Sequence, residues 1–144
     1  MSPVLDYLAN DYPDRILERR SATMPIAEFL AVNLDCANPP ELAEFYSKLT
    51  GATVIYSSDE YAGVEIPGAI TLYFQKVADH RPPTWPDSER PQQSHLDFYV
   101  ENLADAEAAA LEFGASKPGF QPGGEKCLVM LDPAGHPLCL CVRS

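Results

Sequence analysis

The chain has 144 residues, of which 46% are hydrophobic, and this is enough for one domain with a substantial core. Its 21 acidic and 10 basic residues give a formal charge of −11, which argues against nucleic acids and anionic membranes as partners because both attract basic patches. No apolar run approaches the roughly 18 residues that a membrane-spanning helix needs, and no signal peptide is evident.

Residues 1–25 are polar, charged and weakly periodic, and we interpret them as an N-terminal extension to a single domain at 26–144. The first half of that domain is a module at about 26–77. It opens with a predicted strand at about 28–36, in which apolar and polar positions alternate. A strong helix-start signal follows, with Asn38 as the capping residue and proline at the first helical position.

Gly51 is predicted to end this first helix, because a left-handed residue is usually needed there. Three strands are then expected, near 52–57, 61–66 and 69–76. Residues 78–92 contain four prolines and Trp85, which is typical of a semi-rigid connector rather than a helix or a central strand.

The second module, at about 93–144, repeats the order of the first. A strand at 94–100 leads to Asn102, a second helix-capping residue, and Gly114 is expected to end the helix. The three strands that follow are predicted near 116–120, 125–131 and 137–142.

An internal repeat is therefore visible at an offset of 64 residues between the first strands (31 to 95) and 63 between the glycines (51 to 114). Both halves have the order strand, helix and three strands. This predicts an α+β fold of paired βαβββ modules. A helix is expected to cover one face of each module and to leave the other face as a concave surface for a ligand.

The four cysteines, Cys36, Cys127, Cys139 and Cys141, show neither a CxxC pair nor zinc-ribbon spacing. Without a recognisable secretion signal, free thiols in a reducing compartment are the expected state. The sequence therefore predicts a cytoplasmic protein without disulfides.

Several short motifs occur in a characteristic order. They are LDCANP at 34–39, FY at 45–46, WPD at 85–87, RPQQ at 90–93, HLD at 95–97 and DPAGHP at 132–137. With them, residues 26–143 resemble the vicinal oxygen chelate superfamily, which includes glyoxalase I, extradiol dioxygenases and bleomycin-resistance proteins, and most of all its glyoxalase-like domains. The resemblance implies a curved, half-barrel mixed sheet with helices on the outer face.

In metal-using members, the resemblance implies four ligands from the first and fourth strands of each module. The matching positions here are Ala31 and His95 on the first strands, Tyr73 or Gln75 on one fourth strand, and Cys139 on the other. Alanine cannot bind a metal, and a thiol is soft where a hard carboxylate is expected. His95 and Gln75 are thus the only retained ligand candidates, so a divalent metal is left open and no firm metal site is predicted.

Three polar or aromatic residues share one face of the strand at 94–100 by two-residue alternation: His95, Asp97 and Tyr99. A carboxylate beside an imidazole is a candidate acid–base pair, although a solvated sheet face would show the same pattern. Trp85 either stacks on a ligand or plugs the connector against the sheet. The predicted pocket residues are Asn33, Asp35, Tyr73, Gln75, Trp85, His95, Asp97, Tyr99 and Cys139.

The function predicted from these features is the binding of a small, planar or aromatic metabolite or antibiotic, without a bound metal, by a homodimer. One alternative is a divalent-metal-dependent lyase, isomerase or dioxygenase with an incomplete ligand set. Another is a metal-free acid–base enzyme that uses His95 and Asp97, so the sequence leaves catalysis undecided.

Overall fold

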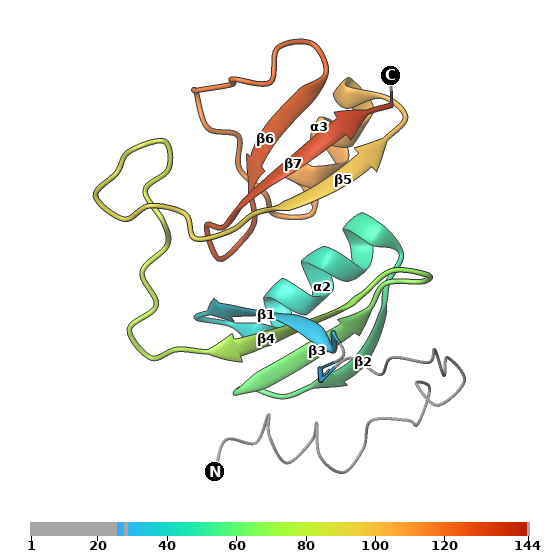
Figure 1. The fold of residues 1–144 in the computed structure, drawn as a ribbon, viewed down its shortest axis with the longest axis vertical. Coiled ribbons are helices and arrows are strands. Elements are labelled where there is room, and N and C mark those ends of the chain that lie inside the picture. The colour runs from blue at the N-terminus through green and yellow to red at the C-terminus, as the bar shows by residue number, and fades with distance from the viewer. Residues whose placement is uncertain (1–25, 28, 144) are drawn as a thin grey trace.

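Figure 1 shows the computed structural model, which describes residues 26, 27 and 29–143. The predicted extension at 1–25 and residue 28, at the start of the first expected strand, lie outside the described residues. The predicted α+β class and paired modules are confirmed. The strands form two separate sheets, with orders β1-β4-β3-β2 and β5-β7-β6. Among the described residues, no helix is long and apolar enough to cross a membrane.

The first sheet belongs to the first module. Its strands are β1 (Ala31–Cys36), β2 (Thr53–Ser57), β3 (Tyr61–Glu65) and β4 (Thr71–Lys76). β1 runs parallel to β4, and the other neighbours are antiparallel. β1 can run parallel to its one neighbour, β4, because the chain between them is long and includes a helix, whereas β2, β3 and β4 follow one another through short turns.

The two helices begin where their capping residues predicted. α2 (Pro39–Thr50) follows Asn38, whose side chain accepts a hydrogen bond of 3.2 Å from the backbone N–H of Glu41. α3 (Leu103–Glu112) follows Asn102, which accepts one of 2.9 Å from Asp105. Gly51 ends α2 with φ of 72°, the left-handed conformation that its sequence position called for.

The second sheet has one strand fewer than the sequence predicted for the second module. It contains β5 (Leu96–Val100), β6 (Cys127–Leu131) and β7 (Pro137–Val142). The strand expected at 116–120 is reduced to a single bridge between Ser116 and Leu131, because Pro118 cannot donate to a ladder and Gly119 weakens it.

A side chain replaces part of the missing pairing at the edge of β6. The amide of Gln121 donates to the carbonyl of Val129 at 2.9 Å and accepts from the N–H of Val129 at 2.8 Å. The backbone polar groups of that residue are therefore satisfied without a neighbouring strand.

Both sheets pack on one hydrophobic core, and Tyr46 of α2 lies at its centre. The ring of Tyr46 stacks on Phe74 of β4 at 5.5 Å between centroids and lies 6.2 Å from Phe98 of β5. α2 consequently contacts the inner faces of both sheets (Figure 1). It follows that the other face of each sheet points away from this shared core.

A buried hydrogen bond joins the modules at the same residue. The hydroxyl of Tyr46 donates to Oδ2 of Asp132 at 2.7 Å, and Asp132 is only 3% exposed. Oδ1 of Asp132 accepts two backbone N–H groups, from Ala134 and His136, each at 2.9 Å. Burial raises the pKa of Asp132 and raises that of Tyr46 well above its usual value, although these hydrogen bonds and nearby His136 partly counteract the shift at Asp132.

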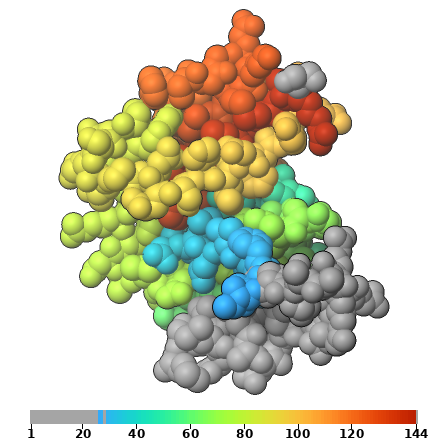
Figure 2. Space-filling view, in the orientation of Figure 1, coloured from blue at the N-terminus to red at the C-terminus, as the bar shows by residue number. Residues whose placement is uncertain are grey.

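The connector lies along the junction of the two modules, where it appears yellow-green in Figure 2. The ring of His80 is hydrogen-bonded through Nε2 to the carbonyl of Ala134 at 2.8 Å. Pro82 packs so closely on Gly135 that any side chain there would collide with it. The connector is thus attached to the turn after Asp132.

We expect Tyr46→Phe to lower the free energy of unfolding at pH 7 by roughly 1–3 kcal/mol, because the buried carboxyl of Asp132 loses a hydrogen-bond donor. Urea unfolding followed by circular dichroism measures the change. Tyr99→Phe is the matched control, since Tyr99 is 69% exposed. Equal stability of the two variants would contradict a structural role for this hydrogen bond.

Candidate functional site

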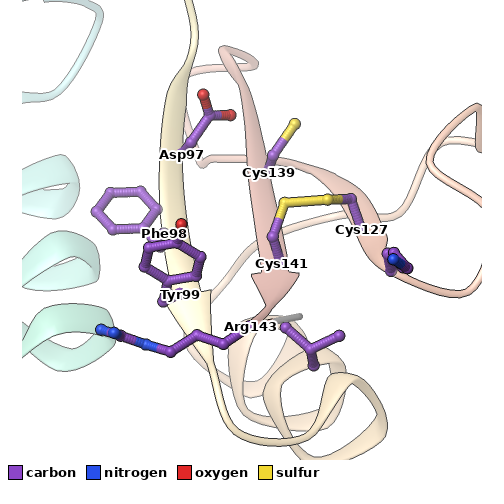
Figure 3. A pocket seen from close by; sticks show the side chains of 9 residues that line it. Asp97, Phe98, Tyr99, Cys127, Cys139, Cys141 and Arg143 are labelled. Atoms are coloured by element: carbon purple, nitrogen blue, oxygen red, sulfur yellow. A yellow bond between two sulfur atoms is a disulfide. The ribbon is translucent and has the colours of Figure 1, made fainter.

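The second sheet carries a cavity of about 850 Å³ on the face turned away from the core. Its lining comes from β5, β6, β7 and the residues beside them: Asp97, Phe98, Tyr99, Lys126, Cys127, Cys139, Cys141, Val142 and Arg143 (Figure 3). The parallel register pairs Asp97 with Cys139 and Tyr99 with Cys141. Alternation along each strand therefore directs these four side chains to the same face.

An imidazole, a carboxylate and a thiol meet at one end of this cavity. His95, immediately before β5, lies with Nδ1 3.0 Å from Oδ1 of Asp97 and 3.9 Å from Sγ of Cys139. Burial, with a further contribution from Asp97, raises the pKa of Cys139 to about 11. At neutral pH Cys139 is therefore a thiol, and it is not an activated nucleophile.

The other end of the cavity is aromatic and cationic. The Tyr99 side chain is 69% exposed, and the guanidinium carbon of Arg143 lies 4.6 Å from the centroid of its ring. Lys126 also lines the cavity. In a chain of net charge −11, the cavity thus has two cationic side chains in its lining, which would attract an anionic group.

A disulfide between Cys127 and Cys141 corrects the expectation of four free thiols. These residues face each other across β6 and β7 with Cα atoms 4.2 Å apart. They form a non-hydrogen-bonded pair, because the flanking Val142 N–H donates to the carbonyl of Lys126, and such pairs bring side chains closest. Only Cys36 and Cys139 are free. The separation of 14 residues between Cys127 and Cys141 did not by itself predict a disulfide.

The predicted pocket residues of the first module lie elsewhere. Asn33 and Asp35 border a second cavity of about 530 Å³, which the connector also lines. Tyr73 is buried, and its ring stacks on Tyr61 at 5.4 Å between centroids. Gln75 pairs in register with Asp35 on the first sheet. The structure therefore does not bring the nine predicted residues into one pocket.

Trp85 packs on the second module rather than on either group of polar residues. Its ring lies 5.7 Å from that of Phe120, in the segment where the missing strand was expected. Of the nine predicted residues, the structure groups His95, Asp97, Tyr99 and Cys139 on one face. It leaves the other five on the first sheet or the connector.

The donors required by the family's four-ligand metal site are not assembled within this chain. Ala31 offers only a methyl group and packs beside Tyr61 and Tyr73. Gln75 belongs to the first sheet and His95 precedes a strand of the second, so the two retained candidates lie in different sheets. These residues do not fit that metal site, and we derive no reaction step through it.

Sequence reasoning missed two kinds of residue. Lys126 and Arg143 reach the cavity only because β6 and β7 pair as they do. His136, which lies in the DPAGHP motif and was not among the predicted site residues, is half-buried and is hydrogen-bonded through Nε2 to the carbonyl of Asp35 at 2.6 Å. In the sequence, only the position of His136 directly after the turn at Asp132 could have marked it as a residue of this region.

Solved structures with the same fold support this architecture. A glyoxalase/bleomycin resistance protein/dioxygenase family enzyme from Burkholderia phytofirmans PsJN has a TM-score of 0.60 at 17% identity, over 81% of this chain and 98% of that one. The fosfomycin resistance protein FosX from Listeria monocytogenes has a TM-score of 0.61 at 14% identity, over 83% and 96%. At such identities the likeness shows the fold alone.

No curated protein matches the chain in sequence. A family model described as "Glyoxalase-like domain" matches residues 31–141, which is most of the chain and includes both modules. This agrees with the motifs that suggested the resemblance and with the fold of the structural neighbours. The chain therefore belongs to the glyoxalase-like domain family, within the vicinal oxygen chelate superfamily.

Proposed function

We propose that the chain binds a small organic molecule on the outward face of its second sheet and retains it without chemical change. The observation that carries this proposal is the cavity of about 850 Å³, a size typical of sites for drug-sized ligands. Sequestration requires shape and contacts but no reacting group, so it does not depend on the missing metal ligands.

The lining indicates the chemical class of the ligand. Tyr99 presents an aromatic surface on which a planar ring stacks favourably. Arg143 adds positive charge beside it, and Lys126 lines the same cavity, so a planar molecule with an acidic group fits best. Structural neighbours described as bleomycin- or fosfomycin-resistance proteins support a ligand of antibiotic size.

A screen of planar organic acids by thermal shift tests this proposal, because a ligand of the folded state raises the melting temperature. For a ligand that does so, we expect Tyr99→Ala to weaken binding roughly tenfold, since a stacked aromatic pair contributes about 0.5–1.5 kcal/mol beyond its area. Leu111→Ala, at an exposed leucine of α3, is the control. Equal losses in the two variants, or no ligand among the acids, would argue against this site.

A second function, metal-free acid–base catalysis, is favoured by one specific contact. Nδ1 of His95 lies 3.0 Å from Oδ1 of Asp97. If Nδ1 carries the proton and donates it to the carboxylate, Nε2 is left with a lone pair that accepts a proton from a bound molecule. Asp97 would then act as a positioning residue that holds the ring and its tautomer.

One experiment distinguishes sequestration from catalysis. Each stabilising ligand is incubated with the protein, and the recovered ligand is examined by mass spectrometry and NMR. Catalysis predicts conversion that His95→Gln abolishes and that Asp97→Asn slows by roughly 10²-fold or more. Glu101→Gln, on the exposed segment after β5, is the control. Unchanged ligand from the wild-type protein supports sequestration alone.

We propose in addition that the chain is a homodimer. The uncovered faces of the two sheets point away from the shared core, so a single chain cannot close one pocket from both modules. Exposed apolar side chains on both modules, including Val54, Tyr56 and Phe120, would be covered by a second copy.

Sedimentation equilibrium measures this directly. Because one chain has a mass of 15.8 kDa, the expected dimer has twice that mass at micromolar concentration. Val54→Glu should shift the equilibrium toward monomer, since it places a charge among these apolar side chains, whereas Glu44→Gln, at an exposed position of α2, should leave it unchanged. A wild-type mass of 15.8 kDa at all concentrations would rule out the dimer.

A further inference from the structure

The cavity of about 530 Å³ that Asn33 and Asp35 border lies where the connector passes β1, and we call it the connector cavity. Its lining comes from β1, from the connector with the two residues that follow it, and from His136. Figure 2 shows the connector directly beside β1, which is blue there. The connector cavity has no lining residue in common with the cavity on the second sheet, so the two are independent sites.

Hydrogen bonds within the protein hold the wall of the connector cavity in place. On one side, Nε2 of His136 is hydrogen-bonded to the carbonyl of Asp35 at 2.6 Å. On the other side, the N–H of Arg90 donates to the hydroxyl of Thr84 at 2.9 Å, and its Nε donates to the carbonyl of Pro82 at 3.0 Å. The cavity is therefore shaped before a ligand enters, which lowers the entropy that binding costs.

One buried acceptor in this wall has no partner. Oε1 of the Gln92 side chain is shielded from solvent and accepts no hydrogen bond from any residue that the structure describes. A buried polar atom without a partner destabilises the folded protein, so such an atom in a cavity wall indicates that a bound molecule supplies the donor. The molecule bound here therefore carries an N–H or an O–H group.

The lining also offers one negative and one positive side chain to a ligand. Asp35 of β1 and Arg81 of the connector both line the cavity, and neither forms an ion pair within the described part of the chain. The remaining two charged groups are already engaged, since the guanidinium of Arg90 lies 3.4 Å from the carboxylate of Glu89. A molecule with one cationic and one anionic group would find a charged partner for each.

We propose that the connector cavity is a second binding site, for a small zwitterion of the amino-acid or dipeptide class. The ammonium group of the ligand donates to the carboxylate of Asp35 and to Oε1 of Gln92, and its carboxylate accepts from the guanidinium of Arg81. Pro83 and Pro91 line the same cavity and offer apolar surface to the rest of the ligand. Because a zwitterion has no net charge, the net charge of −11 does not repel it.

Thermal shift with the full-length chain tests the class of ligand. The probes are the standard L-amino acids, glycylglycine and alanylalanine at millimolar concentration, and we expect at least one to raise the melting temperature. Its N-acetyl and C-terminal amide forms each lack one charge, so calorimetry should show that they bind roughly tenfold or more weakly. No effect of any probe, or equal affinity for the blocked forms, would overturn the proposal.

Two variants test the charged contacts. Asp35→Asn and Arg81→Gln should each weaken binding of the same probe roughly tenfold or more. Arg81→Gln should leave the affinity for the amide form unchanged, because that form has no carboxylate to lose. Glu44→Gln and Lys48→Gln are the matched controls, since each removes one charge of an exposed ion pair on α2. Equal losses in variants and controls, or no loss in Asp35→Asn and Arg81→Gln, would contradict these contacts.

Gln92→Met separates a role in binding from a role in the fold. It removes the unpartnered oxygen and keeps the length of the side chain, so urea unfolding should show an unchanged or higher free energy of unfolding. The affinity for the probe should fall roughly threefold to tenfold, because the ligand loses an acceptor. Wild-type affinity in Gln92→Met would show that Oε1 takes no part in the site. Circular dichroism checks that each variant is folded.

Discussion

The contact of Tyr46 with both modules is the constraint on which the rest of the structure depends. Its ring packs against Phe74 of one sheet and lies near Phe98 of the other, and its hydroxyl satisfies the buried carboxyl of Asp132. An apolar ring with one polar tip can occupy the centre of a core only if that tip finds a partner. Because both sheets bury their inner faces here, their remaining faces must point outward.

That arrangement explains why the two halves of the repeat differ in chemistry. On the first sheet, the face turned from the helix carries Ala31 and the Tyr61–Tyr73 stack beside the polar side chains of Asn33, Asp35 and Gln75. The corresponding face of the second sheet carries an imidazole, a carboxylate and three sulfurs beside an exposed aromatic ring. The proposed binding of a planar acid therefore belongs to one module.

Local signals predicted most of the elements but failed at particular residues. Asn38 and Asn102 marked the helix starts because a cap is read from a few neighbouring residues. The strand near 116–120 failed because Pro118 and Gly119 oppose pairing, and the Gln121 side chain took over its hydrogen bonds. Of the predicted pocket residues, those on β5 and β7 share a face, since alternation correctly gave the side of each strand.

The sequence by itself determined the repeated order of elements, the helix caps and the residue types available for chemistry, because these depend on periodicity and nearest neighbours. Only the tertiary structure decided which strands pair and in what register. That register places Cys127 opposite Cys141 and Cys139 beside Asp97, and it separates Gln75 from His95. The parallel pairing of β5 with β7 joins residues about forty positions apart in the chain, and burial of both modules on a single core stabilises it, which no local pattern encodes.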